Sequence, residues 1–409
     1  MAGVDTTTIT NLVKRVYTKD VLENLQNQAA DTWPKLKKSS KKPNGEGLFG
    51  GNISAGNQRG QGSQNELEAL RTPGHQVTNQ YKIVPKVFTH LIRLSGLSMD
   101  VAKGNEDSFA DNQTLQMDEG LKDATKEINA QMFRDGSGKI AQVNGAISPS
   151  TSLVYDHGCP THFKVGMFID VLNSGTKEID SVEITDNDIP TQTLTIASST
   201  CTDDMWIYRE DTADNAPTDG KEIAGFPRIT DDGSDVATYE GIIRTGAGYI
   251  SAWKGLEYAA GGANISDDML QQACARGKVY AGAKYNNITS NTSQVRKYIA
   301  LTLPSVKFEP GKKRDSGAGK GVEADGVWQG KTWTIDTDCP FDEVILWNDE
   351  YVERYDVRDL SFDDSDGKIL KWDQGYDAFV MYAKHYGNVG TIHPRKAAFR
   401  ITGLATPTF

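Results

Sequence analysis

The densest group of potential metal ligands is a short segment with two histidines and a cysteine. His157, Cys159 and His162 fall within six residues. Imidazole nitrogen and thiolate sulfur are ligands that zinc prefers, so a fourth ligand from elsewhere would complete a tetrahedral site. A polar turn ahead of a strand accounts for the same residues without a metal. We adopt that interpretation and predict no metal site.

A second candidate is a glycine-lysine motif similar to a phosphate-binding loop. Gly326, Gly330, Lys331 and Thr332 are one residue short of the spacing in GxxxxGK[ST]. Trp328 lies inside the segment, where its bulk would crowd a loop that must wrap around phosphates. We therefore expect a β turn and no nucleotide binding.

An aspartate-rich segment, Phe362–Gly367, is similar to a calcium-binding loop. Such a loop begins with a carboxylate ligand and has a bidentate glutamate at its twelfth position. Here those two positions hold Phe362 and Asp373. An Asp-rich turn between strands is the better interpretation.

Residues suited to acid-base or nucleophilic catalysis are sparse. The chain has six histidines and contains neither a GxSxG nor an HExxH pattern. No pair of carboxylates stands out as glycosidase-like in the sequence. We therefore predict no catalytic residue, no cofactor and no metal, and a protein that is not an enzyme.

Composition indicates an ordered protein with a large polar surface. Of its 409 residues, 37% are hydrophobic and 24% are charged, and 40 are glycine. This length predicts about two to three domains. The formal net charge of −11 argues against DNA binding as the main task, because phosphate neutralisation needs a basic face.

One dense basic run lies near the N-terminus, between Pro34 and Pro43. One interpretation is a solvated, flexible tail. The other is a segment that faces DNA, a scaffold protein or an adjacent subunit. The lysines of this basic run are Lys35, Lys37, Lys38, Lys41 and Lys42.

The cysteines and the N-terminal sequence indicate a reducing cytoplasm and no membrane. The four cysteines are widely scattered, so a disulfide framework is not expected. The N-terminus has no signal-peptide pattern, and nowhere do about 18 apolar residues run together.

The elements that position these residues begin with an amphipathic helix expected over residues 11–30. A Gly-, Asn-, Gln- and Ser-rich stretch from Asn44 to Asn65 lacks the apolar content to fold by itself. From Gln76 to Met99, frequent β-branched residues predict two long strands. These segments together form an extended loop. A neighbouring subunit is its natural stabiliser, because isolated hairpins are marginal in water.

The clearest element is a helix from Asp107 to Arg134, where apolar residues recur every three or four positions. Its outer face is expected to bear Lys126, paired with Asp123. Asp135–Gly138 ends it. Short strands from Gly158 to Arg209 then predict a compact β module, a small barrel or sandwich.

A mixed α+β part completes the chain. A helix is expected over Asp267–Arg276, with Ser266 as its N-cap. A second helix is expected after Thr292, and strands dominate beyond Gln329.

The order of these features resembles the major capsid proteins of tailed double-stranded DNA bacteriophages. Their Hong Kong 97-like fold also occurs in encapsulin shells and in the floor of herpesvirus capsids. Glu66–Met99 is similar to the family's extended loop, and the helix from Asp107 is similar to its spine helix. A later block is similar to the segment G-L-P … Y-x-G-I-x-R of many members; it comprises Glu222, Phe226, Pro227, Tyr239 to Arg244, and Trp253. The β module is similar to an insertion that some members contain.

The resemblance implies an α+β fold in seven consecutive parts. They are an N-terminal arm (1–45), an extended β-hairpin loop (46–104), the spine helix with the start of a peripheral domain (105–157), an inserted small β-barrel-like domain (158–212), a connecting loop with more of the peripheral domain (213–264), a mixed α+β axial domain with peripheral-domain strands (265–390), and a C-terminal strand (391–409).

The resemblance also implies a function and partners. Many copies, as hexamers and pentamers, would form the icosahedral head that encloses the phage DNA in the virion, after assembly in the host cytoplasm. Besides other copies, the expected partners are a portal protein and packaged DNA held weakly by an acidic shell, and a decoration protein is a further candidate. The arm is short, so we expect a separate scaffolding protein. We predict neither a covalent cross-link nor a maturation cleavage.

Mixed charges on a loop that cannot fold alone lead to a hypothesis about contacts between subunits. Arg59, Glu66, Glu68 and Arg71 are expected to form intersubunit charge pairs. Alternatives are an encapsulin-like compartment or another virion protein, such as a tail component. From a different class, a β-rich hydrolase or carbohydrate-binding protein stays open through the β module.

Overall fold

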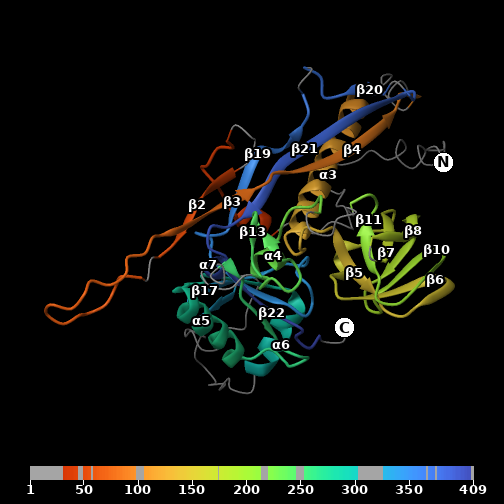
Figure 1. Ribbon diagram of the computed structural model, residues 1–409. Coiled ribbons are helices and arrows are strands. Elements are labelled where there is room, and N and C mark those ends of the chain that lie inside the picture. Colours follow the sequence, from red (N-terminus) through yellow and green to blue (C-terminus); the bar gives the residue numbers. More distant parts are fainter. Residues whose placement is uncertain are drawn as a thin grey trace, which may run out of the picture.

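The computed structural model describes residues 31–44, 49–56, 59–97, 106–173, 175–212, 220–245, 253–302, 326–364, 367–373 and 375–406. Figure 1 shows a body with two sheets, a separate β-barrel, and a long loop that projects away from the body. The helix expected over residues 11–30 lies outside the described residues.

The spine helix α3, Glu106–Gln131, runs along one face of strand β4, Lys86–Ser95. Gly120 allows the close approach, because a Cβ at this position would clash with the side chain of Ile92. The amides of Met132 to Arg134 bond to carbonyl groups three residues back. The helix predicted to end at Arg134 therefore finishes in a tighter turn after Gln131.

The last turns of α3 are covered on all sides. Lys126, expected on a solvent-facing side, is buried and forms an ion pair with Asp338 at 2.9 Å. The expectation of an exposed lysine is therefore wrong. Arg209 of the β-barrel pairs with Glu127, and Asp338 contacts Lys126 and Asn129. Local periodicity does not reveal these distant contacts.

The first sheet of the body, the peripheral sheet, is built around β21, Ala378–Gly390. Strands β19 (Glu353–Phe362) and β20 (Lys371–Asp373) pair with successive stretches of one edge of β21, and β4 pairs with the other edge. The short strand β1, Lys37–Lys38, joins the arm to β19 in parallel.

The second sheet, the axial sheet, has the strand order β14-β22-β18-β15-β17-β16. It shares a hydrophobic core with helices α5 (Asp267–Ala281) and α6 (Thr292–Thr302). Its strands are β14 (Glu257–Ala259), β15 (Asn287–Ser290), β16 (Gly326–Trp328), β17 (Lys331–Ile335), β18 (Val344–Trp347) and β22 (Ala398–Thr402).

The predicted cap of α5 is confirmed, because Oγ of Ser266 accepts a hydrogen bond from the amide of Met269 at 3.3 Å. The helix extends beyond the predicted end at Arg276. It stops before Gly282, whose left-handed φ of 65° suits a helix C-terminus.

The inserted β module is a barrel with its own hydrophobic core. Its strand order is β8-β7-β11-β5-β6-β10-β9. Strand β8 pairs with β7, and β9, which follows β8 directly in the chain, pairs with β10. These pairings close the sheet on itself. The strands are β5 (Lys139–Val143), β6 (Ile147–Asp156), β7 (Phe168–Asn173), β8 (Thr176–Glu183), β9 (Asp186–Asp188), β10 (Thr193–Cys201) and β11 (Trp206–Arg209).

The barrel begins earlier in the chain than expected. Its first two strands, β5 and β6, precede the predicted start at Gly158. The sequence does not mark this earlier start, because β6 is rich in serine and its buried residues do not alternate regularly.

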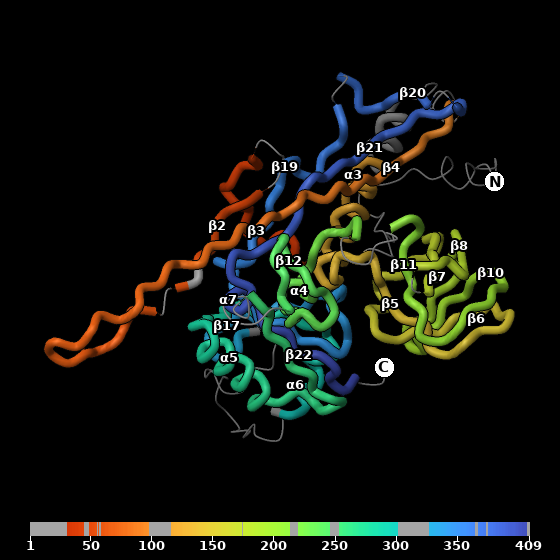
Figure 2. Tube along the Cα trace, viewed as in Figure 1, coloured from red at the N-terminus to blue at the C-terminus, as the bar shows by residue number. Residues whose placement is uncertain are grey.

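The extended loop is a hairpin in which β2, Phe49–Ala55, pairs with β3, Val77–Ile83, along its whole length (Figure 2). The two strands predicted between Gln76 and Met99 are confirmed as β3 and β4. Strand β2 lies in the Gly-rich stretch and was not predicted. Glycine is needed there, because a Cβ on Gly51 would lie 2.7 Å from the hydroxyl of Tyr81.

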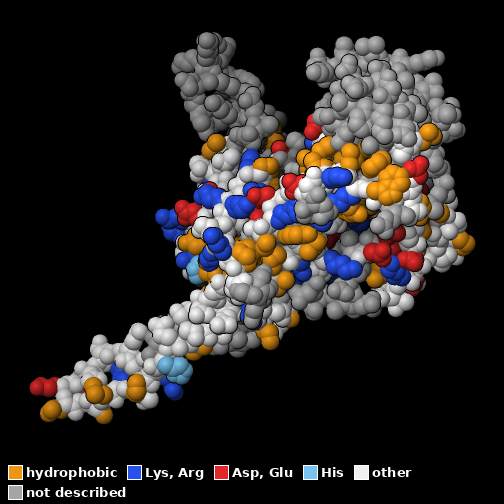
Figure 3. All heavy atoms as spheres, turned by 90° about the horizontal axis from the view of Figure 1, so that it is seen from above, with side chains coloured by type: hydrophobic (Ala, Val, Ile, Leu, Met, Phe, Trp, Pro, Cys, Tyr) orange, Lys and Arg blue, Asp and Glu red, His pale blue; other side chains and the backbone are white. Residues whose placement is uncertain are grey.

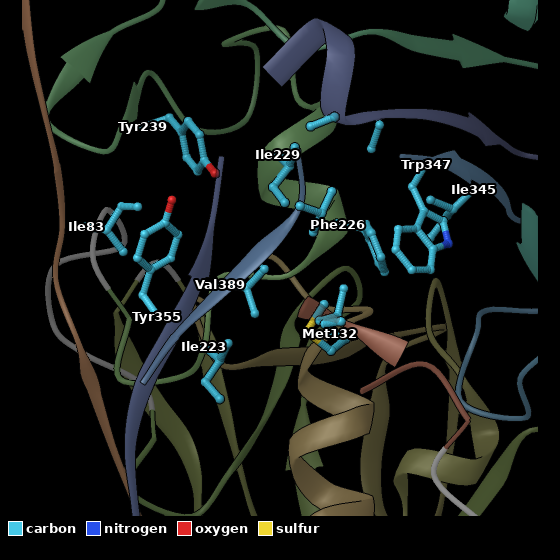
Figure 4. Close-up of a cluster of buried hydrophobic side chains, with 14 of the residues drawn as sticks. Ile83, Met132, Ile223, Phe226, Ile229, Tyr239, Ile345, Trp347, Tyr355 and Val389 are labelled. Carbon is cyan, nitrogen blue, oxygen red and sulfur yellow. The ribbon is translucent and has the colours of Figure 1, made fainter. Parts of the chain in front are cut away.

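A central core joins the arm, the loop and both sheets. In Figure 4, side chains from different elements point toward one another. Ile83 comes from the base of the loop, Met132 follows the spine helix, and Trp347 comes from the axial sheet. The same cluster contains Trp33 of the arm. The base of the loop and the arm are thus held by the chain's own core.

Candidate functional site

The histidine and cysteine segment joins the barrel to the body. Sγ of Cys159 lies 3.4 Å from the carbonyl oxygen of Thr337, and Nε2 of His162 lies 2.9 Å from that of Asp338. Burial lowers the pKa of His162 well below its usual value, so the ring is neutral. His157 is exposed and points to no shared site. Within the described residues, no three His, Cys, Asp or Glu side chains are grouped to hold a metal ion.

A buried ionic network fixes the barrel to the spine helix. Nη1 of Arg134 lies 3.1 Å from Oε1 of Glu127 and 2.8 Å from Oε1 of Glu222. Arg209 of β11 lies 3.2 Å from the other carboxylate oxygen of Glu127. Burial alone would raise the pKa of Glu127, but Arg209 and Arg134 outweigh it and hold the pKa at about 2. The Glu127 carboxylate therefore stays negatively charged. The ion pairs of this network join the spine helix, strand β11 and the segment that contains Glu222.

The glycine-lysine motif forms the predicted β turn. Gln329 and Gly330 have φ angles of 47° and 77° and connect β16 to β17 in a two-residue hairpin. Nε1 of Trp328 donates a hydrogen bond to Asp267 at 2.8 Å, and Nζ of Lys331 lies 4.9 Å from the centre of the Trp328 ring. The lysine therefore packs on a tryptophan of its own hairpin.

The aspartate-rich segment uses its first carboxylate inside the peripheral sheet. Asp363 is buried and lies 3.3 Å from Arg358, 3.0 Å from Lys371 and 2.8 Å from Lys384. Three basic side chains thus neutralise the charge of this carboxylate. In a calcium-binding loop, the carboxylate would instead bind the ion.

The far end of the extended loop is the most exposed part of the chain that the structure describes. Figure 3 shows the loop projecting from the body, with hydrophobic and acidic side chains at its end. Leu67 is fully exposed and Leu70 is 88% exposed. Large apolar side chains in such a position indicate an interaction site.

A short turn shapes this end of the loop, and we call Asn65–Leu70 the apex turn. The Glu68 amide donates a hydrogen bond to the carbonyl oxygen of Asn65 at 3.2 Å, and the Glu68 carboxylate accepts one from the Asn65 amide at 2.9 Å. Leu67 has a φ of 66°, a conformation that is costly for a branched side chain. The turn therefore presents a leucine to solvent at an energetic cost.

The four charged residues predicted to pair between subunits all lie on the exposed loop. Two of them also shape it: Glu68 closes the apex turn, and Nη2 of Arg71 donates a hydrogen bond to the carbonyl oxygen of Ser63 at 2.6 Å. Arg59, which precedes these contacts, and Glu66, which lies within the apex turn, are both exposed. Their pairing with another subunit stays a prediction.

The basic run is part of the folded body. Nζ of Lys35 donates to Thr334, Lys37 pairs with Asp349 at 3.1 Å, and Lys38 pairs with Asp359 at 2.7 Å. Nζ of Lys41 donates a hydrogen bond to the hydroxyl of Tyr81 at the base of the loop, and Lys42 is exposed. The interpretation as a flexible tail is therefore wrong for this segment, because Trp33 and Leu36 anchor it in the central core.

A groove lies beside the base of the loop and has a volume of about 240 Å³. We call it the apolar groove. Arg395 and Lys396 border it, and no carboxylate is among the described residues that line it. Its apolar lining comprises Ile53, Val77, Ile242, Trp253, Tyr280 and Ile392.

Apolar side chains are also exposed on the peripheral sheet. Val87 and Leu91 of β4, Val357 of β19 and Trp372 of β20 are each at least half exposed. Together with the loop and the groove, these exposed side chains are suited to contacts with other subunits.

Neither the leucines of the apex turn nor the apolar groove was predicted from the sequence. The leucines had a local signal, since they are the only large apolar residues in the polar stretch from Asn57 to Thr72. The groove had none, because its lining comes from six separate segments of the chain.

The architecture is similar to that of solved structures. Neither a protein-family model nor a curated protein matches the sequence. The structure is similar to the capsid asymmetric unit of cyanophage A-1(L), with a TM-score of 0.55, 10% sequence identity, and coverage of 98% of this chain and 100% of that one.

Two further structures are more distant. The one for Gordonia phage Cozz has a TM-score of 0.47 and 9% identity, and covers 97% of this chain and 93% of its own. The holo-SrpI encapsulin complex from Synechococcus elongatus has a TM-score of 0.46 and 8% identity, and covers 99% and 96%. The cyanophage likeness shows that the chain has a phage capsid fold, so the predicted fold is confirmed. Of the helices that the structure describes, none combines the length and apolar character of a membrane span.

Proposed function

We propose that this chain is the major capsid protein of a tailed phage. Many copies would assemble as hexamers and pentamers into an icosahedral head around double-stranded DNA, and the protein would reside in the virion after assembly in the host cytoplasm. Its role would be structural and not catalytic. The observation that supports this most directly is the extended loop, with a base built into the central core and an end exposed to solvent.

The physical argument rests on what the loop lacks. Its base shares Phe49, Tyr81 and Ile83 with the core, whereas the residues from Arg59 to Arg71 are all exposed. A two-stranded hairpin gains little stability by itself in water. Contacts with neighbouring copies would bury the exposed leucines, and weak contacts repeated around a closed shell add up.

Other partners follow from the same proposal. An acidic chain, with a net charge of −11, would line a head from which DNA can leave easily. A separate scaffolding protein, a portal protein and a decoration protein would complete the assembly. The basic run would face DNA, scaffold or a neighbour only through charge left after its pairs with Asp349 and Asp359.

Negative-stain microscopy of the purified chain, expressed with and without its candidate scaffolding protein, tests the proposal. The expected result is closed particles of uniform size. A solitary, rigid monomer with an ordered loop would contradict it. The cargo separates the alternatives, because enclosed DNA favours a phage head and an enclosed enzyme favours an encapsulin-like compartment.

A further inference from the structure

The apex turn and the apolar groove have complementary chemistry. The apex turn contains two leucines and two glutamates and no basic residue. The groove is lined by aliphatic and aromatic side chains and is bordered by Arg395 and Lys396. His393 also lines the groove, and its pKa is lowered, mainly by burial and secondly by the charge of Lys396. The positive charge of the groove therefore comes from Arg395 and Lys396.

The apex turn also has the form of a preorganised ligand. Two hydrogen bonds between Asn65 and Glu68 hold it, and Leu67 keeps a left-handed backbone although its side chain is fully exposed. A costly conformation that leaves a large apolar side chain unburied within the chain suggests a contact outside it. Preorganisation of this kind reduces the entropy lost on binding.

We propose that the apex turn of one copy docks in the apolar groove of a second copy of this chain. Leu67 and Leu70 would enter the groove, and Glu66 would face Arg395 and Lys396. This inference rests on the proposed function and names the surface that receives the loop.

The hairpin's own geometry favours a second copy as the occupant. Leu67 is ten residues from Val77 of the groove, which for extended strands is about 33 Å. Strands β2 and β3 pair along their whole length, and the loop points away from the body, so its own groove is out of reach (Figure 1). The donor and receptor surfaces differ, and a contact of this type closes into a ring when the rotation between copies allows it.

A disulfide trap tests the docking directly. Leu67→Cys would be combined with Ser54→Cys, since Ser54 is exposed at the groove. After mild oxidation of assembled particles, the double variant should give a ladder of covalent multimers that collapses on reduction. The matched control pairs Leu67→Cys with Glu178→Cys, an exposed position on the barrel, and should stay monomeric. Equal cross-linking of the two pairs would overturn the inference.

Charge reversal provides an independent test. Glu66→Lys and Lys396→Glu should each lower the particle yield by about tenfold, because many equivalent contacts weaken together. Combining the two should restore most of the yield, which a folding defect would not do. Glu178→Lys serves as the matched control and should leave the yield unchanged. A double variant no better than the worse single variant would contradict the docking.

The outcomes distinguish this inference from the proposed function. If the unmodified chain forms no particles, both fail. If particles form but neither the trap nor the charge reversal responds as expected, only the docking fails. If the trap instead yields a covalent product with a different protein of the particle, the groove has another occupant and the inference is wrong.

Discussion

Nη1 of Arg134 lies 2.8 Å from Oε1 of Glu222 and joins the end of the spine helix to the segment that leads into α4, Phe226–Thr230. Both side chains are buried. Burial raises the pKa of Glu222, and Arg134 opposes that shift. The arginine therefore balances two carboxylates, since it also contacts Glu127.

Arg134→Ala is expected to lower the free energy of unfolding by about 3–5 kcal/mol, because it leaves buried carboxylates without their partner. Chemical denaturation would measure the loss. The control is Lys122→Ala, which removes an exposed ion pair with Glu119 and should cost about 0.5 kcal/mol. Equal losses in the two variants would show that the network contributes no more than a surface pair.

The arm provides a second test of stability. Trp33 is buried, and Asn129 of the spine helix accepts a hydrogen bond from its amide at 2.9 Å. Trp33→Ala should cost about 3–5 kcal/mol, as for other large aromatic residues in cores. Lys37→Ala, which removes a largely exposed pair with Asp349, should cost about 1 kcal/mol or less. A neutral Trp33→Ala would mean that the arm is not anchored as described.

Periodicity predicted the elements whose burial follows a regular pattern. Ala124 and Ile128 of the spine helix and Met132 just after it are buried at intervals of four residues, and β4 alternates between exposed and covered side chains. Strand β2 escaped prediction because its glycines are selected by the close approach of Tyr81, which is a tertiary contact.

The surfaces that would join subunits were predicted only in part. The exposed loop follows from a polar, glycine-rich composition that cannot form a core. The apolar groove does not follow from composition, because Ile53, Tyr280 and Ile392 meet only after the chain has folded. The basic run was misinterpreted for a related reason: its acidic partners Asp349 and Asp359 lie more than 300 residues away in the sequence.

The carboxylate of Glu240 predicts a dependence of stability on pH. Oε1 of Glu240 accepts a hydrogen bond from the amide of Thr391 at 2.9 Å, and the second carboxylate oxygen is buried although the residue as a whole is partly exposed. Burial raises the pKa of Glu240 from 4.5 to about 8. The folded chain therefore binds a proton that the unfolded chain has released, and stability falls as the pH rises from about 4.5 to about 8.

Glu240→Gln should remove this contribution while keeping an acceptor for the Thr391 amide. Between about pH 5 and about pH 8, the variant should lose less stability than the unmodified chain, by up to about 1.4 kcal/mol per pH unit. Denaturant unfolding at several pH values would measure the difference. Glu178→Gln, an exposed change on the barrel, should follow the unmodified chain. Identical slopes for Glu240→Gln and the unmodified chain would exclude this role.

The charges of the loop are expected to matter for assembly. Replacing Arg59, Glu66, Glu68 and Arg71 together with glutamine should lower the particle yield and the thermal stability of the particles. Part of this effect would arise within one chain, since Glu68 and Arg71 hold the loop's own hydrogen bonds.

A narrower variant separates the two causes. Glu66→Gln keeps the hydrogen bonds of Glu68 and Arg71 and leaves Arg59 in place, so the loop should retain its shape while charge toward a neighbour is lost. The particles should melt at a lower temperature, with a smaller shift than in the fourfold variant, and the difference should shrink at high salt because exposed charges are screened. The matched control is Glu178→Gln, a change of an exposed acidic residue on the barrel. If Glu66→Gln melts with the control, the predicted charge pair of Glu66 with another subunit does not exist.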